Sequence, residues 1–146
     1  MAPASSGQQR SPIHAGLPGG FVFATGIECS YPRIAGPNGR SVRVDELEKS
    51  FHYRHWQQDL ALVRELGLRC LRFGPPYYRV HAAPDGYDWE FTDLVFAQMH
   101  RLGIVPIVDL CHFGVPDWMS GFNDPAFAAH FPQYAQAFAR RSKRAP

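Results

Sequence analysis

A five-residue pattern occurs twice in this chain, with a spacing of 36 residues. The first copy, RELGL, ends at Leu68, and the second copy, HRLGI, ends at Ile104. In both copies an amphipathic segment precedes the glycine and an apolar run follows it. The pattern therefore predicts two helices that end at Gly67 and Gly103, each followed directly by a strand.

Helices and strands are expected to alternate along the chain. The predicted elements are a buried strand over 21–27, a loop over 30–50, a helix from about Tyr53 to Leu66, a strand over 68–73, a helix over 91–102, a strand over 104–110 and a helix from Pro125. The strand over 104–110 is almost continuously apolar, which is typical of a parallel strand covered on both faces. Pro106 counts against a central position for it. Alternation of this kind predicts a parallel sheet with right-handed crossovers, as in a doubly wound sheet or a (β/α)8 barrel.

The last predicted helix carries its own start signal and an aromatic stripe. Asp124 is expected to cap its N-terminus, and Pro125 suits the first helical position. An aromatic stripe recurs at helical spacing and is interpreted as core: Phe127, Phe131, Tyr134 and Phe138. We expect Pro132 to kink or restart this helix.

The two ends of the chain differ in composition from the rest. Residues 1–19 are polar and rich in proline and glycine, so we expect a disordered arm. The folded domain is expected over 20–141, followed by an irregular basic tail over 142–146. Four of the basic residues lie near the C-terminus: Arg140, Arg141, Lys143 and Arg144. Without them, the chain has 11 Lys and Arg and 13 Asp and Glu. We therefore expect no nucleic-acid partner, and the lack of an 18-residue apolar run predicts no membrane span.

Cysteine and histidine usage argues against disulfides and metals. The chain has three cysteines, no CxxC motif and no apolar segment typical of a signal peptide near its start. A reducing, cytoplasmic setting is expected. His52 and His55 have the spacing of a metal pair, but no third ligand lies nearby in the sequence. No metal or other cofactor is predicted.

Polar side chains lie at the carboxyl end of each predicted strand, and parallel βα folds bind their ligands at these ends. Glu28 follows the first strand, Arg72 lies in the second, and His112 follows the third, with Trp118 six residues later. Each residue also has a structural interpretation. Arg72 and Glu28 could form an ion pair with each other. His112 could be hydrogen-bonded within the protein at the end of its strand, and Trp118 could pack inside its own loop. Together they suit a rim that hydrogen-bonds a polyol and stacks on its ring.

Several segments resemble the family 1 β-glycosidases. Leu71-Arg72-Phe73 is similar to the family's "YRFS" strand, and residues 101–106 resemble "DxLLxxGIxPxV". Residues 109–118 resemble "TLxHxDLPxWL", and the helix over 127–138 resembles "FxxYAxxxF". The resemblance covers about residues 21–141 and implies an incomplete (β/α)8 barrel of about three βα units.

The resemblance also implies roles for the four candidate residues. His112 would hydrogen-bond sugar hydroxyls, Arg72 would orient the nucleophilic carboxylate, and Trp118 would shape the mouth of the site. The family usually has a sugar-binding Gln after its first strand, and Glu28 is expected to take over that role. Asp109 replaces the family's usual Thr, which is a second departure.

The family's two catalytic carboxyls are the remaining question. The resemblance places the first of them in an Asn-Glu-Pro motif after a fourth strand, and this chain contains no Asn-Glu. A (β/α)8 barrel takes about 250 residues. We therefore expect an N-terminal portion of a retaining β-glycosidase that needs further barrel units, is inactive alone and is poorly soluble or molten.

Two other readings remain open at this stage. The chain could be a small non-catalytic module that binds a carbohydrate or another partner through the same four residues. It could also be a small α/β enzyme with a Cys111–His112 pair, although adjacent strand residues point to opposite faces.

Overall fold

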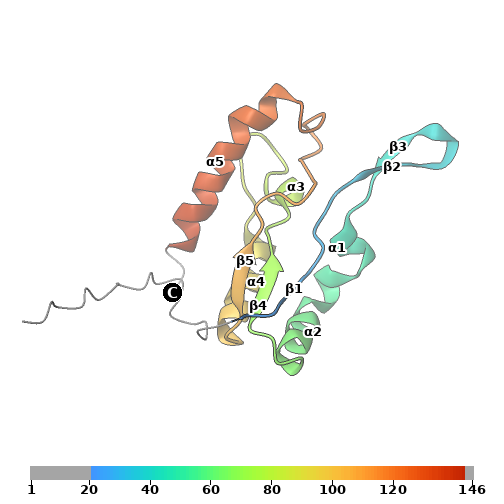
Figure 1. The fold of residues 1–146 in the computed structure, drawn as a ribbon. Helices are drawn as coiled ribbons and strands as arrows, with labels where there is room; N and C mark the ends of the chain where they lie inside the picture. The colour runs from blue at the N-terminus through green and yellow to red at the C-terminus, as the bar shows by residue number, and fades with distance from the viewer. Residues whose placement is uncertain (1–20, 144–146) are drawn as a thin grey trace, which may run out of the picture.

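The computed structural model describes residues 21–143, and its centre is a three-stranded parallel sheet. The strands are β1 (Ala24–Gly26), β4 (Cys70–Phe73) and β5 (Val105–Val108), in the order β1-β4-β5 (Figure 1). Parallel neighbours with helical crossovers are the predicted α/β arrangement. This arrangement is the one predicted for the start of a doubly wound sheet or of a (β/α)8 barrel.

The repeated pattern produces two identical helix ends. Helix α2 (His52–Glu65) is followed by Gly67, and α4 (Glu90–Arg101) by Gly103, both with positive φ. At both ends the residue after the glycine donates its N–H five positions back and the glycine donates three positions back, which closes a Schellman motif. The predicted helix–glycine–strand units are confirmed.

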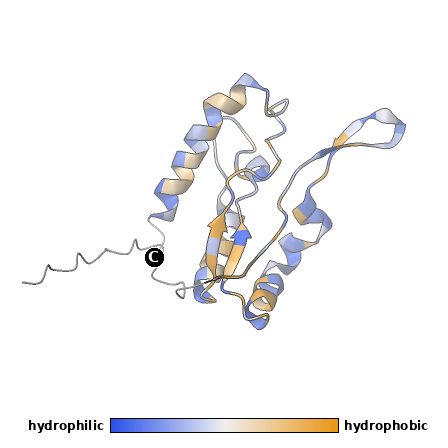
Figure 2. Ribbon diagram, in the orientation of Figure 1, coloured by the Kyte–Doolittle hydropathy of each residue, from blue (hydrophilic) through white to orange (hydrophobic). Residues whose placement is uncertain are grey.

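One face of the sheet packs on α2 and α4. The side chains of Leu71 and Phe73 are fully buried, and they contact Leu60 from α2 and Met99 from α4 in one hydrophobic cluster. Figure 2 shows β5 and the first part of β4 as hydrophobic segments between helices of mixed hydropathy. Burial of these side chains, at roughly 25 cal/mol per Å² of apolar surface, is the main stabilising contribution to this layer.

Helix α5 (Pro125–Ser142) forms a second cluster with the short helix α3 (Tyr77–Val80). Asp124 caps α5 as predicted, since its side chain accepts from the Ala126 N–H. Of the predicted aromatic stripe, Tyr134 is fully buried and stacks on Trp89, and Phe127 and Phe131 are partly buried against the same cluster. The helix runs through Pro132 without restarting.

The segment expected to be one loop over 30–50 is more ordered than predicted. It contains the hairpin β2 (Arg33–Ala35) and β3 (Ser41–Arg43), joined by a 3-10 turn (Pro37–Gly39), and then α1 (Glu46–Lys49). The hairpin projects away from the sheet (Figure 1). Its strands are short and exposed, so no alternating apolar pattern marked them.

The outer strands are less buried than predicted. β1 covers only the middle of the segment 21–27, and the side chains of Phe21 and Phe23 are 85% and 72% exposed. Ile107 in β5 is 49% exposed, and β5 has no neighbour on its far side within residues 21–143. Pro106 lies on this edge strand, where a missing N–H is tolerated.

Parts of the sequence lie beyond the description. The predicted arm over 1–19 and the last three residues of the predicted tail fall outside residues 21–143, whereas Ser142 is the last residue of α5. Of the helices between residues 21 and 143, none combines the length and apolarity that a membrane crossing requires.

Candidate functional site

The second face of the sheet carries a polar cluster at the carboxyl ends of the strands. Gly26, Arg72 and Ile107 are register partners, so their side-chain positions share one face. Because orientation alternates along a strand, Glu28 and Asp109, each two residues further on, are expected on that same face. This is the face opposite to the one that packs on α2 and α4.

Three of the four predicted site residues meet there. His112 Nε2 lies 2.7 Å from Glu28 Oε1, and Arg72 Nη2 lies 3.7 Å from Glu28 Oε2. Arg72 Nη1 lies 3.0 Å from His112 Nδ1. Glu28 is thus both a partner of Arg72 and a neighbour of His112, and it remains half exposed.

Asp109 joins this cluster, although it was not predicted as a site residue. Its Oδ2 lies 2.9 Å from His112 Nδ1 and 3.2 Å from Arg72 Nη1. The signal in the sequence was its place at the end of a strand, three residues before His112. We call Glu28, Arg72, Asp109 and His112 the strand-end network.

The network combines two carboxylates with a guanidinium and an imidazole. Doubly protonated, His112 donates to Glu28 through Nε2 and to Asp109 through Nδ1. Protonated at Nε2 alone, it donates to Glu28 and accepts from Arg72. In both states Nε2 is the donor toward Glu28, the more exposed of the two carboxylates.

Trp118 does not belong to the network. Its indole Nε1 donates to the carbonyl oxygen of His81 at 2.8 Å, and its ring meets His81 and His130 edge to face. It packs against the second hydrophobic cluster. This position favours the structural reading of Trp118 over contact with a ligand at the strand ends.

The arrangement gives no support to a cysteine nucleophile. The Cys111 thiol donates to the carbonyl oxygen of Gly114, and His112 turns to the carboxylates instead. Burial raises the pKa of the Cys111 thiol to about 11, and burial likewise raises the pKa of Cys29 to about 11. Both side chains are therefore thiols at neutral pH, whereas a nucleophile must be a thiolate.

The described residues also hold no metal centre. Within 21–143, no group of three or more His, Cys, Asp or Glu side chains is placed to bind an ion. Buried His52 pairs with Asp59 through Nδ1 at 2.6 Å, while exposed His55 contacts Gln58. The two histidines of the metal-like spacing thus have separate partners.

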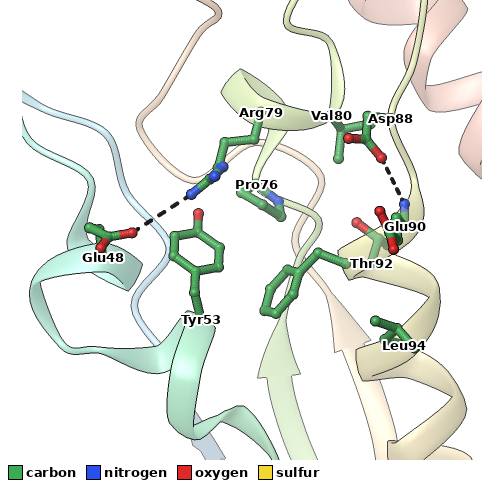
Figure 3. Close-up of a pocket in the computed structure, with 10 residues that line it drawn as sticks. Glu48, Tyr53, Pro76, Arg79, Val80, Asp88, Glu90, Thr92 and Leu94 are labelled. Atoms are coloured by element: carbon green, nitrogen blue, oxygen red, sulfur yellow. Dashed lines mark hydrogen bonds and ion pairs between the residues drawn. The ribbon is translucent and has the colours of Figure 1, made fainter.

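A groove of about 350 Å³ lies away from the network, between α2, α3 and the start of α4 (Figure 3). Arg79 extends across it toward Glu48, and its guanidinium lies over the Tyr53 ring, 4.2 Å from the centroid. On the opposite wall, Asp88 accepts from the Glu90 N–H. Arg79 and Glu48 thus pair with each other across the groove.

Comparisons with known proteins point to one family. Residues 37–144 match the family model described as glycosyl hydrolase family 1. The aryl-phospho-beta-D-glucosidase BglA of Bacillus subtilis is 31% identical over 100 residues, which is 62% of this chain and 21% of that protein. The human cytosolic beta-glucosidase is 29% identical over 94 residues, 58% of this chain and 20% of that protein.

Solved structures agree on the fold. The AHE enzyme from Alicyclobacillus herbarius superposes with a TM-score of 0.54 at 27% identity, over 57% of this chain and 20% of that one. The family 1 b-glucosidase from Thermotoga maritima gives a TM-score of 0.52 at 22% identity, over 59% of this chain and 21% of that one. The chain thus matches about a fifth of the length of these relatives.

Proposed function

Because this chain belongs to glycosyl hydrolase family 1, we propose that it forms the first three βα units of a retaining β-glycosidase barrel. In this proposal the strand-end network is one wall of the sugar site. His112 and Glu28 hydrogen-bond sugar hydroxyls, and Arg72 orients a carboxylate supplied by another part of the barrel. No cofactor takes part.

The strand-end network is the observation that carries the proposal. Charged groups from three neighbouring strands meet at the carboxyl ends, which is where (β/α)8 enzymes bind substrate. Glu28 is 53% exposed on its side chain while both of its oxygens face cationic or donor groups. A sugar hydroxyl can therefore reach the Glu28 carboxylate from solvent.

The expected chemistry is double displacement. One carboxylate attacks the anomeric carbon and a second carboxyl protonates the leaving oxygen, with the two groups about 5–5.5 Å apart. This chain contains no Asn-Glu, the dipeptide that carries the first catalytic carboxyl in the glycosidases it resembles. We infer that this chain alone binds sugar without hydrolysing it, and that the catalytic carboxyls come from further barrel units.

The substrate class follows from the relatives. Two relatives described above are named as an aryl-phospho-beta-D-glucosidase and a cytosolic beta-glucosidase. We propose a glucose-configured β-glycoside as substrate and the cytoplasm as location. The three free cysteines, Cys29, Cys70 and Cys111, support a reducing compartment.

A non-catalytic carbohydrate-binding module is the second candidate. The observation in its favour is that both carboxylates of the network are already paired. Such a module would bind sugar as the glycosidase portion would, but it would need no further barrel units. Restored hydrolysis when the chain is joined to the later units of a family 1 barrel would decide for the glycosidase.

The test is a titration of the full chain with methyl β-D-glucoside, in which NMR measures the binding. We expect weak saturable binding that His112→Ala reduces about tenfold, the effect of losing a charge-assisted hydrogen bond. His55→Ala, on the exposed face of α2, is the matched control and leaves affinity unchanged. Hydrolysis of p-nitrophenyl β-D-glucoside should stay at background. Absence of binding, or binding that His112→Ala leaves intact, would contradict the proposal.

A further inference from the structure

We infer that Asp109 is a positioning residue that acts through His112: it fixes the imidazole so that Nε2 donates toward Glu28 and the sugar. The inference rests on the proposed function, because it concerns the same site. It assigns a role to a residue at which this chain departs from the pattern of the glycosidases it resembles.

The two ring nitrogens of His112 face two different carboxylates. Nδ1 lies 2.9 Å from Asp109 Oδ2, and Nε2 lies 2.7 Å from Glu28 Oε1. A ring turned over by 180° would present carbon atoms to both oxygens. The carboxylates therefore select a single ring orientation, as outer partners do for functional histidines.

Asp109 is the more firmly held of the two carboxylates. Its Oδ1 accepts from the Cys111 N–H at 3.3 Å, and its Oδ2 also faces Arg72. Its backbone N–H donates to the Phe73 carbonyl oxygen at 3.4 Å, which ties it to the end of β4. Its side chain is 29% exposed, whereas that of Glu28 is 53% exposed.

The difference in exposure gives the two carboxylates different roles: Glu28 meets the sugar, and Asp109 holds the imidazole. A sugar hydroxyl that approaches half-exposed Glu28 competes for the oxygen that His112 Nε2 now contacts. In the doubly protonated ring, Nε2–H is then free to donate to the sugar, while Nδ1–H keeps donating to Asp109. Loss of the Asp109 charge would let the ring turn, and sugar affinity would fall although Asp109 does not touch the sugar.

A double-mutant cycle on the full chain tests this coupling, with methyl β-D-glucoside as the probe. Asp109→Asn should weaken binding about fivefold, a typical net loss for one hydrogen bond. In the His112→Ala background the same substitution should have no further effect, because the residue through which Asp109 acts is gone. Equal effects of Asp109→Asn in both backgrounds would overturn the inference.

The nitrogen signals of His112 provide a readout that does not need sugar. In the wild type we expect the Nδ1 signal to show a proton donated to Asp109 beside the proton on Nε2, and Asp109→Asn should change the Nδ1 signal. Asp85→Asn, in an exposed turn, is the matched control and should change nothing. Unchanged His112 signals in Asp109→Asn would also overturn the inference.

The two proposals fail in different ways. If the wild type binds no sugar but the ring signals respond to Asp109→Asn, the proposed function fails and the positioning role stands. If sugar binds through His112 while Asp109→Asn changes neither affinity nor signals, only the positioning role fails. Asp109→Ser replaces Asp109→Asn if the amide spectrum shows that the latter does not fold.

Discussion

The carbonyl oxygen of Asp109 lies where a side chain at position 74 would begin. A Cβ added to Gly74 would be 1.6 Å from this oxygen and 2.6 Å from the carbonyl carbon. Both neighbours are backbone atoms, so they cannot move aside as a flexible side chain would. The ends of β4 and β5 thus come together through a glycine, directly beside the strand-end network.

Gly74→Ala should therefore destabilise the chain and disturb Asp109. We expect a loss of about 3 kcal/mol in the free energy of unfolding, which is the upper part of the range for overpacking. Urea unfolding followed by circular dichroism measures it.

Gly86→Ala is the matched control for this substitution. A Cβ at Gly86 would meet nothing within 4 Å, so the change should stay within about 0.5 kcal/mol. Similar losses for Gly74→Ala and Gly86→Ala would show that the close approach to Asp109 does not limit position 74.

His81 should make the stability of the chain depend on pH. Burial lowers the pKa of His81 below its ordinary value of 6.5, the hydrogen bond to the Pro84 carbonyl opposes this, and His130 lowers it further. The unfolded chain therefore takes up the proton first as the pH falls. Stability should be unaffected by His81 above about pH 6.5 and decline below it.

Urea midpoints at pH 7.5 and 5.5 measure this effect. His81→Gln removes the titrating group and should show a smaller loss on acidification than the wild type. His55→Gln, which changes an exposed histidine, should behave as the wild type does. An equal acid loss in His81→Gln and the wild type would rule out this source of pH dependence.

Cys111 should react slowly with alkylating agents at neutral pH. Because burial raises its pKa to about 11, roughly a hundredth of the ordinary thiolate fraction is present at pH 7.5. Iodoacetamide labelling followed by mass spectrometry should show a rate that climbs up to about pH 11. The urea-unfolded chain serves as the control and should react about a hundredfold faster at pH 7.5. Equal rates in the two states would contradict the raised pKa.

The far edge of β5 should promote association of the isolated chain. Its Ile107 side chain is 49% exposed beside backbone groups that no strand within residues 21–143 pairs with. Ile107→Lys should lower light scattering at high protein concentration. Leu66→Lys, which changes an exposed leucine at the end of α2, should not. An equal decrease in both variants would point to general hydrophobicity instead.

Local patterns predicted the repeating part of the fold well. Gly67 and Gly103 marked two helix ends, and Asp124 marked the start of α5, because each signal acts through hydrogen bonds to residues nearby in the sequence. The hairpin β2–β3 escaped prediction, since its short exposed strands carry no apolar alternation. The exposure of Phe21 and Phe23 was also missed, because burial depends on neighbours that no local pattern specifies.

The candidate site was predictable in its location but not in its membership. Glu28, Arg72 and His112 follow from the rule that parallel strands present their carboxyl ends together. Asp109 joins them because the register of β5 against β4 brings it there, and register is set by packing across strands. Trp118 was placed beside them by sequence proximity to His112, whereas its partner is the carbonyl oxygen of His81.

The fixed spacing between the second helix end, at Gly103, and Asp109 constrains where the chain can gain or lose residues in evolution. Insertions in the hairpin β2–β3 would lengthen an exposed projection and leave the sheet untouched. One residue inserted between Gly103 and Asp109 would turn Asp109 to the face that packs on α2 and α4, because side-chain direction alternates along a strand. Insertions and deletions should therefore be tolerated in the hairpin and selected against between Gly103 and Asp109.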